Sequence, residues 1–446
     1  MKTDVEQLTP TSKKLSIEID ASEVDKRIDR AYREIRKRAK IKGFRPGKAP
    51  LKLLERYYGP QVIEDVQKEL ISETFPKALQ ESELAPLNFP MLEKGPVERG
   101  KSFKYSAIME VRPEIQLSEY LGIEVEKEEV SVSDSDVEER LEQIRKAHGK
   151  LTPVDPERPV REGDYVIVEY EAFSGDQPIE GMRSTNFMIK IGSGDFHPEV
   201  ERGLLGAQKG EEREIHVDFE PDYFHNLLAG KPVDFKIKII DIKEMELPQI
   251  DDEFAKRLDP DLENVEALKA KVRELILQER EREAERDVKA RLMDKIAEGL
   301  EVALPQSMVE SEILDSIESI KQDLLRSGSS LEKAGLSEEK LRQDFRPVAE
   351  KKVKNSLILT EIAKKENISV GEEDLDEAFE DIAKATGQDA EPLRRYYEAR
   401  GLIDSMRQRL LEQKTLNYLL EHANIIIKKP ANRPLETGNS NDKEST

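Results

Sequence analysis

Two kinds of apolar periodicity follow one another at the start of the chain. Residues 15–19 alternate between apolar and polar side chains, which predicts a strand with one buried face. Ser22 is placed to cap a helix, and apolar residues then recur at helical spacing over 24–39. Two glycines and two prolines within 43–50 predict a loop, because they do not fit together in a regular element.

A second helix is predicted after Pro60, where apolar residues form a stripe over 62–79. Alternation over 103–111 predicts a strand that returns to the first one. Together these elements predict a small α+β domain over residues 1–115.

The pattern changes in the middle of the chain. Residues 116–158 are acidic and contain a helical stretch over 135–148, followed by a connector with spaced prolines, which we interpret as a linker. Short alternating strands separated by glycine turns then predict a compact β-rich domain over 159–245.

The C-terminal part is predicted to be helical throughout. Apolar stripes at helical spacing occupy 265–276 and 288–300 and flank a run of charged residues that cannot be packed on all sides. We expect a helical domain over 246–430 and a polar, disordered tail over 431–446. The predicted fold class is therefore multidomain α+β, with a small α+β domain, a β-sheet domain and an elongated all-α domain.

Composition supports elongated elements. Charged residues make up 37% of the 446 residues, and the hydrophobic set makes up another 37%. Ordinary globular proteins have about 25% and 45–50%. So much solvated surface favours thin, charged helices. The net charge of −22 argues against coating of nucleic acid or anionic membrane, unless positive charge is concentrated in one place.

Several classes of protein are disfavoured by what the sequence lacks. It contains no apolar run of about 18 residues, and its first residues do not resemble a signal peptide. It has no cysteine, and its five histidines lack zinc-ligand spacing. We expect a cytosolic protein without metal or cofactor.

The charge is unevenly distributed. Residues 1–115 carry 23 basic and 19 acidic residues, a net +4, whereas the rest of the chain has a net −26. Within Lys26–Lys52, twelve basic residues stand against Asp29 and Glu34, a net +10. This segment is a candidate docking surface for phosphates.

Three interpretations of the loop at Gly43 compete. A nucleotide-binding P-loop is rejected, because the glycine spacing is one residue short and Ala49 replaces the magnesium-binding hydroxyl. A solvated basic helix with an incidental turn and a functional docking loop are about equally compatible with the charge pattern.

The motif Gly43-Phe44-Arg45-x-Gly47-Lys48-x-Pro50 resembles the ribosome-docking loop of bacterial trigger factors, chaperones at the exit of the ribosomal tunnel. The similarity extends from the first strand to about residue 429. It implies an ATP-independent chaperone that binds nascent chains and assists folding and export, with an FKBP-like domain and a helical body with two arms. It also implies weak self-association away from the ribosome, and no role for DNA or a membrane.

The resemblance implies that Phe44 is an apolar anchor and that nearby basic residues pair with RNA phosphates or acidic residues of a ribosomal protein. The expected ribosome-binding set comprises Lys40, Lys42, Gly43, Phe44, Arg45, Gly47, Lys48 and Pro50.

FKBP-type domains catalyse rotation about X–Pro bonds in an aromatic pocket, without a nucleophile. The family's pocket-lining positions correspond here to Tyr170, Phe187 and Phe235 on strands and Tyr223 in the flap. Taken without the resemblance, aromatic residues on short strands are more often core than site.

The pocket pattern also departs from the family. Phe196 and Pro198 agree with the family's pattern, but Val200 replaces its aromatic floor. His197 and Glu199 bring polar groups toward a site that should exclude water. Ile179 and Glu180 stand where an aromatic and an acid are typical. We therefore expect weak or narrowed isomerase activity, with His197 at the rim rather than in catalysis.

Other hypotheses remain at this point. A free prolyl isomerase with helical dimerisation segments would differ by not binding ribosomes. A coiled-coil scaffold is disfavoured because no heptad persists. A nucleic-acid-binding regulator is opposed by the charge of −26 outside the first domain.

Overall fold

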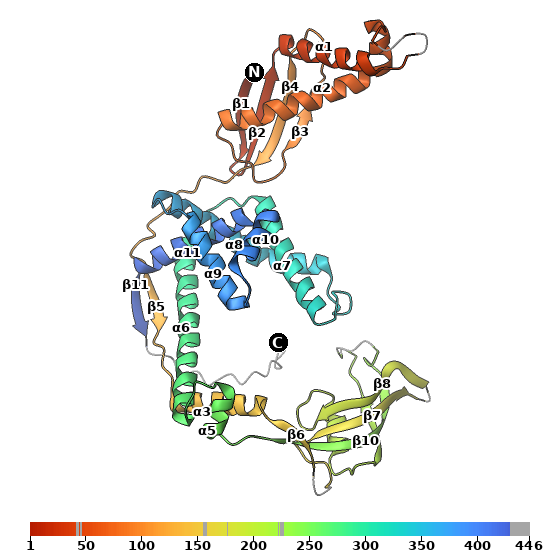
Figure 1. Ribbon diagram of the computed structural model, residues 1–446, viewed down its shortest axis with the longest axis vertical. Helices are drawn as coiled ribbons and strands as arrows, with labels where there is room; N and C mark the ends of the chain where they lie inside the picture. The colour runs from red at the N-terminus through yellow and green to blue at the C-terminus, as the bar shows by residue number, and fades with distance from the viewer. Residues whose placement is uncertain are drawn as a thin grey trace. The chain divides into compact units, whose positions relative to one another are not determined.

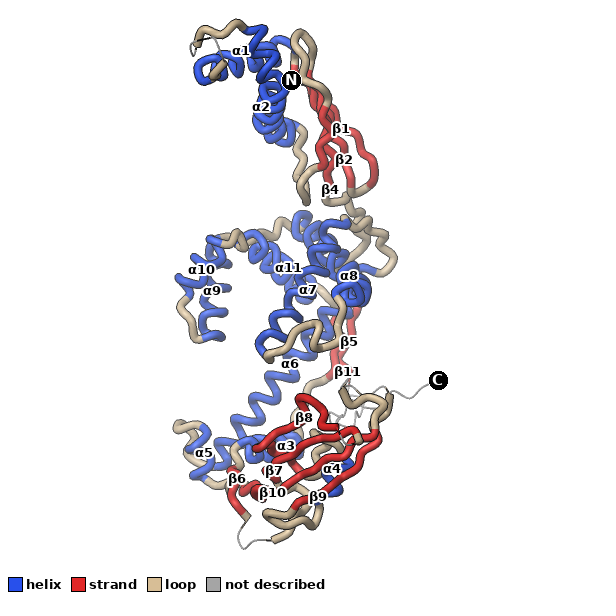
Figure 2. Tube along the Cα trace, turned by 90° about the vertical axis from the view of Figure 1, so that its right-hand side faces the viewer, coloured by secondary structure: helices blue, strands red, loops and turns tan. Residues whose placement is uncertain are grey.

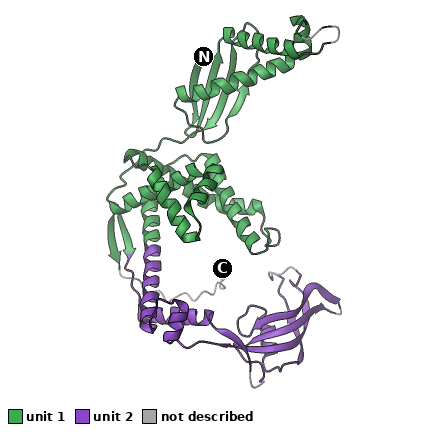
Figure 3. Ribbon diagram, in the orientation of Figure 1, with its two compact units in different colours: residues 1–127, 285–428 green, residues 128–284, 429–446 purple. Residues whose placement is uncertain are grey.

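The computed structural model describes residues 1–41, 44, 47–154, 158–175, 177–221, 223 and 227–428. The described chain separates into two compact units, residues 1–127 with 285–428 and residues 128–284, as Figure 3 shows. The tail predicted to be disordered, 431–446, lies outside the described residues. No helix in the described ranges has the length and apolar character needed to span a bilayer.

The N-terminal part of the first unit is a four-stranded antiparallel sheet of order β1-β2-β4-β3 with two helices on one face (Figures 1 and 2). Its elements are β1 (Lys2–Thr9), β2 (Ser12–Ile19), α1 (Ala21–Arg38), α2 (Leu51–Glu81), β3 (Met91–Lys94) and β4 (Phe103–Glu110). The predicted strands at 15–19 and 103–111 are confirmed as β2 and β4, whose apolar residues face the helices.

Two local predictions in this part are wrong. Asp20, not Ser22, is the N-cap of α1, and Ser22 lies inside the helix. Helix α2 begins at Leu51 and continues through Pro60. Leu54 is buried on the same face as Val62, so its packing outweighs the hydrogen bond that the proline removes.

The β-rich part of the second unit is a five-stranded antiparallel sheet of order β6-β10-β7-β8, with β9 pairing β10. Its elements are β6 (Lys150–Pro153), β7 (Tyr165–Ser174), β8 (Gln177–Lys190), α4 (Pro198–Leu204), β9 (Glu212–Asp218) and β10 (Pro232–Glu246). Alternate residues of β7 and β10 are buried against α4, as expected for strands with one covered face.

The segment interpreted as a linker contains regular elements that pack against other parts of the chain. They are β5 (Glu124–Glu128), α3 (Asp134–Ala147) and β6, and α3 packs against α5 and α6. The domain boundaries proposed from the sequence stay predictions.

The C-terminal part is helical, as predicted, up to residue 421. Its elements are α5 (Asp252–Leu258), α6 (Val265–Ala297), α7 (Gln306–Arg326), α8 (Glu338–Lys365), α9 (Glu372–Thr386), α10 (Ala390–Ala399), α11 (Ile403–Glu421) and β11 (Asn424–Lys428). The helical prediction fails at 424–428, which form a strand paired with β5. Three consecutive β-branched isoleucines favour that strand.

Candidate functional sites

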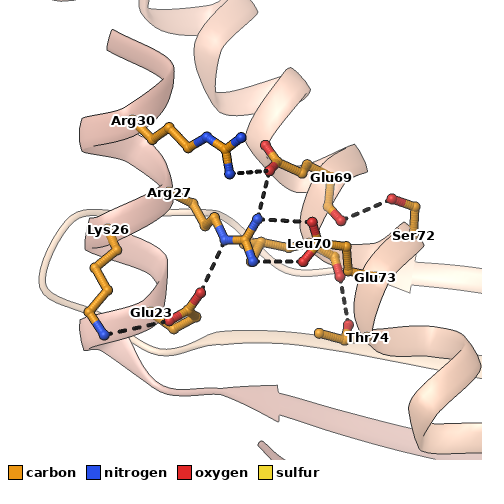
Figure 4. A network of polar contacts seen from close by, with 9 residues as sticks. All are labelled: Glu23, Lys26, Arg27, Arg30, Glu69, Leu70, Ser72, Glu73 and Thr74. Atoms are coloured by element: carbon orange, nitrogen blue, oxygen red, sulfur yellow. Dashed lines mark hydrogen bonds and ion pairs between the residues drawn. The ribbon is translucent and has the colours of Figure 1, made fainter. Parts of the chain in front are cut away.

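The basic helix α1 uses one of its arginines to hold α2. Arg27 lies 3.0 Å from Glu23 on its own helix, and 2.7 and 2.6 Å from Glu69 and Glu73 on α2 (Figure 4). These carboxylates raise the pKa of Arg27, with Glu73 contributing most. Arg27 therefore stabilises the domain and does not offer a free charge, although it is one of the twelve basic residues counted within Lys26–Lys52.

Charges are neutralised near the start of α1 and less so toward its end. Among the described residues, Lys26 lies 3.8 Å from Glu23 and Arg30 lies 4.0 Å from Glu69. Nearer the loop, Lys37 pairs with Glu34 at 2.8 Å. The other basic residues there form no ion pair within 4 Å in the described part of the structure: Arg33, Arg36, Arg38, Lys40, Lys48 and Lys52. The accessible positive charge is thus displaced toward the loop.

The loop after α1 is anchored at both ends. Ala39 and Ala49 are buried, and the Gly47 N–H donates to the Arg36 carbonyl at 2.9 Å. Gly47 has φ of +87°, a conformation that favours glycine, although a Cβ there would meet no atom within 4 Å. The glycine is therefore needed for its backbone angle and not for space.

The predicted ribosome-binding residues that the structure describes lie on this anchored loop. Phe44 is 42% exposed, although it is aromatic, and Lys40, Lys48 and Pro50 are exposed as well. Lys42, Gly43 and Arg45 lie outside the described residues. Beside the loop is a hollow of about 500 Å³ lined by Arg30, Arg33, Glu34, Arg36, Lys37 and Gly47.

The aromatic residues predicted for the isomerase pocket come together with a further phenylalanine. The Tyr170 ring centroid lies 5.5 Å from those of Phe187 and Phe196 and 6.4 Å from that of Phe235. Phe196 also lies 5.7 Å from Phe235. Phe235 is fully buried, and Phe187, on β8, is more than one-third exposed. This group of rings therefore extends from the core of the domain to its surface.

A second group of rings continues from Phe235. The ring centroid of Phe219 lies 6.2 Å from that of Phe235, 4.6 Å from that of Tyr223 and 5.1 Å from that of His197. Burial raises the pKa of Tyr170 and of Tyr223, so both phenols are neutral at physiological pH. We call the seven side chains Tyr170, Phe187, Phe196, His197, Phe219, Tyr223 and Phe235 the aromatic cluster.

The positions that depart from the family pattern have different environments. Val200 lies on α4 and is fully buried in the core that also contains Tyr170 and Phe235, so this position is an aliphatic core residue. Glu199 is exposed and lies 4.0 Å from Arg202, so the prediction that its carboxylate enters the site is wrong. His197 is the N-cap of α4, and its ring accepts a hydrogen bond from the Glu199 N–H at 3.3 Å. Glu180 is exposed and Ile179 packs at the edge of the core.

Sequence reasoning missed two residues that shape this cluster. Phe219 continues the alternation of β9, a signal that could have identified it. Glu201 is buried, and its carboxylate accepts hydrogen bonds from the N–H groups of Gly192, Gly194 and Phe196 at 2.8, 3.1 and 3.3 Å. The carboxylate therefore fixes the loop that presents Phe196 and His197.

The helical part exposes large apolar side chains among charged ones. The α7 and α8 helices pack through Ile313, Ile317 and Val353, but other apolar residues remain exposed. On α7, α8 and the segment between them, these are Leu314, Leu325, Leu336 and Val348. On α7, Ile313 and Ile317 are therefore core residues, whereas the neighbouring Leu314 lies on the surface.

The described residues contain no group of three histidine, aspartate or glutamate side chains arranged to hold a metal ion.

Family models match three successive parts of the chain. Residues 1–144 match "Bacterial trigger factor protein (TF)", residues 156–240 match "FKBP-type peptidyl-prolyl cis-trans isomerase", and residues 264–421 match the trigger factor C-terminus.

Curated relatives match over nearly the full length. The trigger factor of Geobacillus sp. (strain WCH70) is 36% identical over 430 residues, which is 95% of this chain and 100% of the relative. That of Citrifermentans bemidjiense is 35% identical over 426 residues, covering 95% and 98%. A solved trigger factor chaperone structure is similar with a TM-score of 0.48 and 23% identity, covering 94% of this chain and 99% of that one.

Proposed function

The chain belongs to the trigger factor family, and from this premise we propose that the loop between Lys40 and Pro50 is the surface that binds the ribosome. The protein is a ribosome-associated chaperone that binds nascent polypeptides and carries an FKBP-type peptidyl-prolyl isomerase domain. A free prolyl isomerase is not favoured, because both the N-terminal and the C-terminal trigger factor models match.

The observation that supports this loop is an exposed aromatic residue beside unpaired basic residues. Phe44 offers an apolar anchor, and Lys40, Lys48 and Arg36 have no acidic partner among the described residues. Such basic groups pair with RNA phosphates or with carboxylates of a ribosomal protein. The contacts will be salt-sensitive, since each phosphate contact contributes about 0.7–0.9 to the logarithmic salt slope.

Replacing Phe44, Arg45 and Lys48 with alanine tests the loop. We expect loss of co-sedimentation with ribosomes while the fold is retained, because the exposed Phe44 and Lys48 side chains lie outside the core set. A matched control replaces Phe89, Lys77 and Lys94, which are also one aromatic and two basic exposed residues in the same domain. Unchanged co-sedimentation of the loop variant would refute the assignment.

The aromatic cluster is proposed as the proline-binding site, with Tyr170, Phe187, Phe235 and Tyr223 among its lining residues. Aromatic faces pack well against a proline ring and exclude water from the twisting amide. The aliphatic Val200, in the place of the family's aromatic floor, supports an activity that is weak or restricted to few sequences.

Adjacent residues of β8 provide the test. Phe187 touches Tyr170 and Phe196, whereas Met188 follows it on the strand and points to the other face. In a proline-limited refolding assay we expect Phe187→Ala to lower kcat/KM roughly 3–10-fold, which is the value of one or two aromatic contacts. Met188→Ala should stay within about twofold of the wild type. Equal effects of the two substitutions would contradict the assignment of the aromatic cluster as the proline-binding site.

The exposed apolar residues of α7 and α8, such as Leu325 and Val348, are proposed to contact nascent chains. Dispersed apolar contacts among charges give weak, multivalent binding without aggregation. We also propose a cytoplasmic location and weak self-association off the ribosome, in line with the family.

A further inference from the structure

Strands β5 and β11 form a small ribbon at the side of the helical part. They are the two strands of one sheet, and they run side by side in the same direction (Figure 1). The Asn424 N–H donates to the Ile123 carbonyl at 2.9 Å, and Lys428 lies 2.5 Å from Glu126 at the other end. The pairing therefore extends along the length of β11.

The β5 edge of the ribbon is occupied by helix α6. Arg291 donates to the Glu126 carbonyl at 3.2 Å, and Lys295 donates to the Glu124 carbonyl at 2.7 Å. Val125 is fully buried in the core that includes α6. Within the described part of the chain, β11 pairs with no strand other than β5, so its outer edge lacks a partner.

The side chains of β11 are unusually apolar for such an edge. Ile425, Ile426 and Ile427 are 42%, 40% and 69% exposed, and none of them joins a described core cluster. Parallel strands are normally buried, and a two-stranded ribbon is marginal without further strands or a covering layer. Natural proteins usually protect an edge of this kind with charges or proline. Here the three central residues carry neither.

The backbone geometry shows which groups face outward. Because the Asn424 N–H points to β5 and successive residues alternate, the N–H and C=O groups of Ile425 and Ile427 point away from β5. An extended chain lying along β11 could pair with these two residues without disturbing the existing ribbon.

We propose that β11 binds an extended, uncharged, apolar segment of an unfolded polypeptide, which joins the ribbon as a third strand. The proposal rests on the chaperone function, which brings such segments to the protein. Pairing through the backbone accepts many sequences, and the isoleucines on both faces of β11 select apolar neighbours. The absence of charge over 425–427 favours an uncharged occupant.

The chain's own C-terminal residues do not have the chemistry of this occupant. Residues 429–446 contain one large apolar residue, Leu435, and two prolines, Pro430 and Pro434. That sequence cannot supply an apolar strand of several residues, because it has too few apolar side chains and its prolines interrupt strand pairing.

The test uses the full-length protein and a fluorescent peptide whose seven-residue core consists of valine, isoleucine and threonine. Binding is measured by anisotropy, and exchange of the 424–428 amides by mass spectrometry. Ile427→Pro removes an outward N–H that β5 does not use, while Ile427→Val keeps it. We expect the proline variant to bind roughly fivefold more weakly, the value of about one hydrogen bond, and the valine variant to match the wild type.

A peptide with N-methyl groups on alternate residues has the same side chains but cannot pair along one edge. We expect it to bind weakly to the wild type, and we expect the ordinary peptide to slow exchange at 424–428. Equal binding by Ile427→Pro and wild type, or unchanged exchange, would overturn the proposal.

Other occupants give different results. Protection of 424–428 that rises with protein concentration without peptide would identify a second copy of the chain and overturn the proposal. Faster exchange after removal of residues 429–446 would identify the chain's own tail and also overturn it. Aggregation suppression by the wild type, measured alongside, reports the chaperone function separately, so failure of β11 is distinguishable from failure of that function.

Discussion

The basic loop and the aromatic cluster relate to the core of the protein in opposite ways. Phe44 and Lys48 are exposed on a loop whose described residues reach the core through Ala39, Ile41 and Ala49. Phe235 and Tyr170 are themselves core residues of the β-rich domain. The basic loop is attached to the core, whereas the aromatic cluster forms part of the core.

This difference implies different consequences of mutation. Exposed loop side chains contribute little to stability, so their replacement should change binding alone. Rings that fill the sheet–helix interface contribute to both packing and ligand binding, so their replacement should change stability and activity together. The following predictions test that separation.

The largest expected effect is at Phe235. Phe235→Ala should lower the stability of the β-rich domain by about 3–5 kcal/mol, because it removes a fully buried ring, and isomerase activity should fall with it. Urea unfolding followed by hydrogen exchange in β7 and β10 measures the change. Phe173→Ala is the control, since Phe173 lies on the other face of β7 against Lys236 and is only half-buried. Similar losses for both would contradict the prediction.

Two arginines of α1 provide a comparison within one helix. Arg27→Ala should destabilise the N-terminal domain by about 1 kcal/mol and leave the salt slope of ribosome binding unchanged, since Arg27 is paired with glutamates. Arg36→Ala should leave stability unchanged and reduce the slope by about 0.7–0.9, because one phosphate contact is lost. A reversed pattern would mean that the two residues exchange roles.

The Arg27 cluster also predicts a pH dependence. Hydrogen bonding to Arg27 lowers the pKa of Glu73 in the folded state, so this carboxylate stabilises the domain above its ordinary pKa, near 4.3. The contribution is lost as the pH falls below that value and Glu73 is protonated. Between pH 6 and pH 3, the urea midpoint should fall more in the wild type than in Arg27→Ala.

The smallest expected effect is at Gly47. Gly47→Ala places a side chain at a φ of +87° with no steric contact, so the cost is the backbone strain, about 1 kcal/mol. Because the strain falls on the loop, we expect a roughly fivefold loss of ribosome affinity, with the unfolding midpoint of the domain nearly unchanged. Co-sedimentation titrations and urea unfolding would measure the two quantities. A larger loss of stability than of affinity would show that the loop belongs to the core.

Much of the fold could be predicted because its signals are local. Strands β2 and β4 and most helices follow the period of their apolar residues, and the loop motif lies within eight consecutive positions. The family resemblance carried by that motif is confirmed over nearly the whole chain. The site residues within the family's pattern stay predictions.

Other features depend on contacts between distant segments. The pairing of Arg27 with Glu69 and Glu73 removes a charge that every count along the chain includes. Packing of Leu54 carries α2 through a proline, and pairing with β5 makes 424–428 a strand. Periodicity records which face of an element is buried, but it does not record the partner. The roles of Arg27, Glu201 and β11 therefore follow from long-range packing. The partner that packs against each of them decides whether its charge, its carboxylate or its strand edge is free to bind something else.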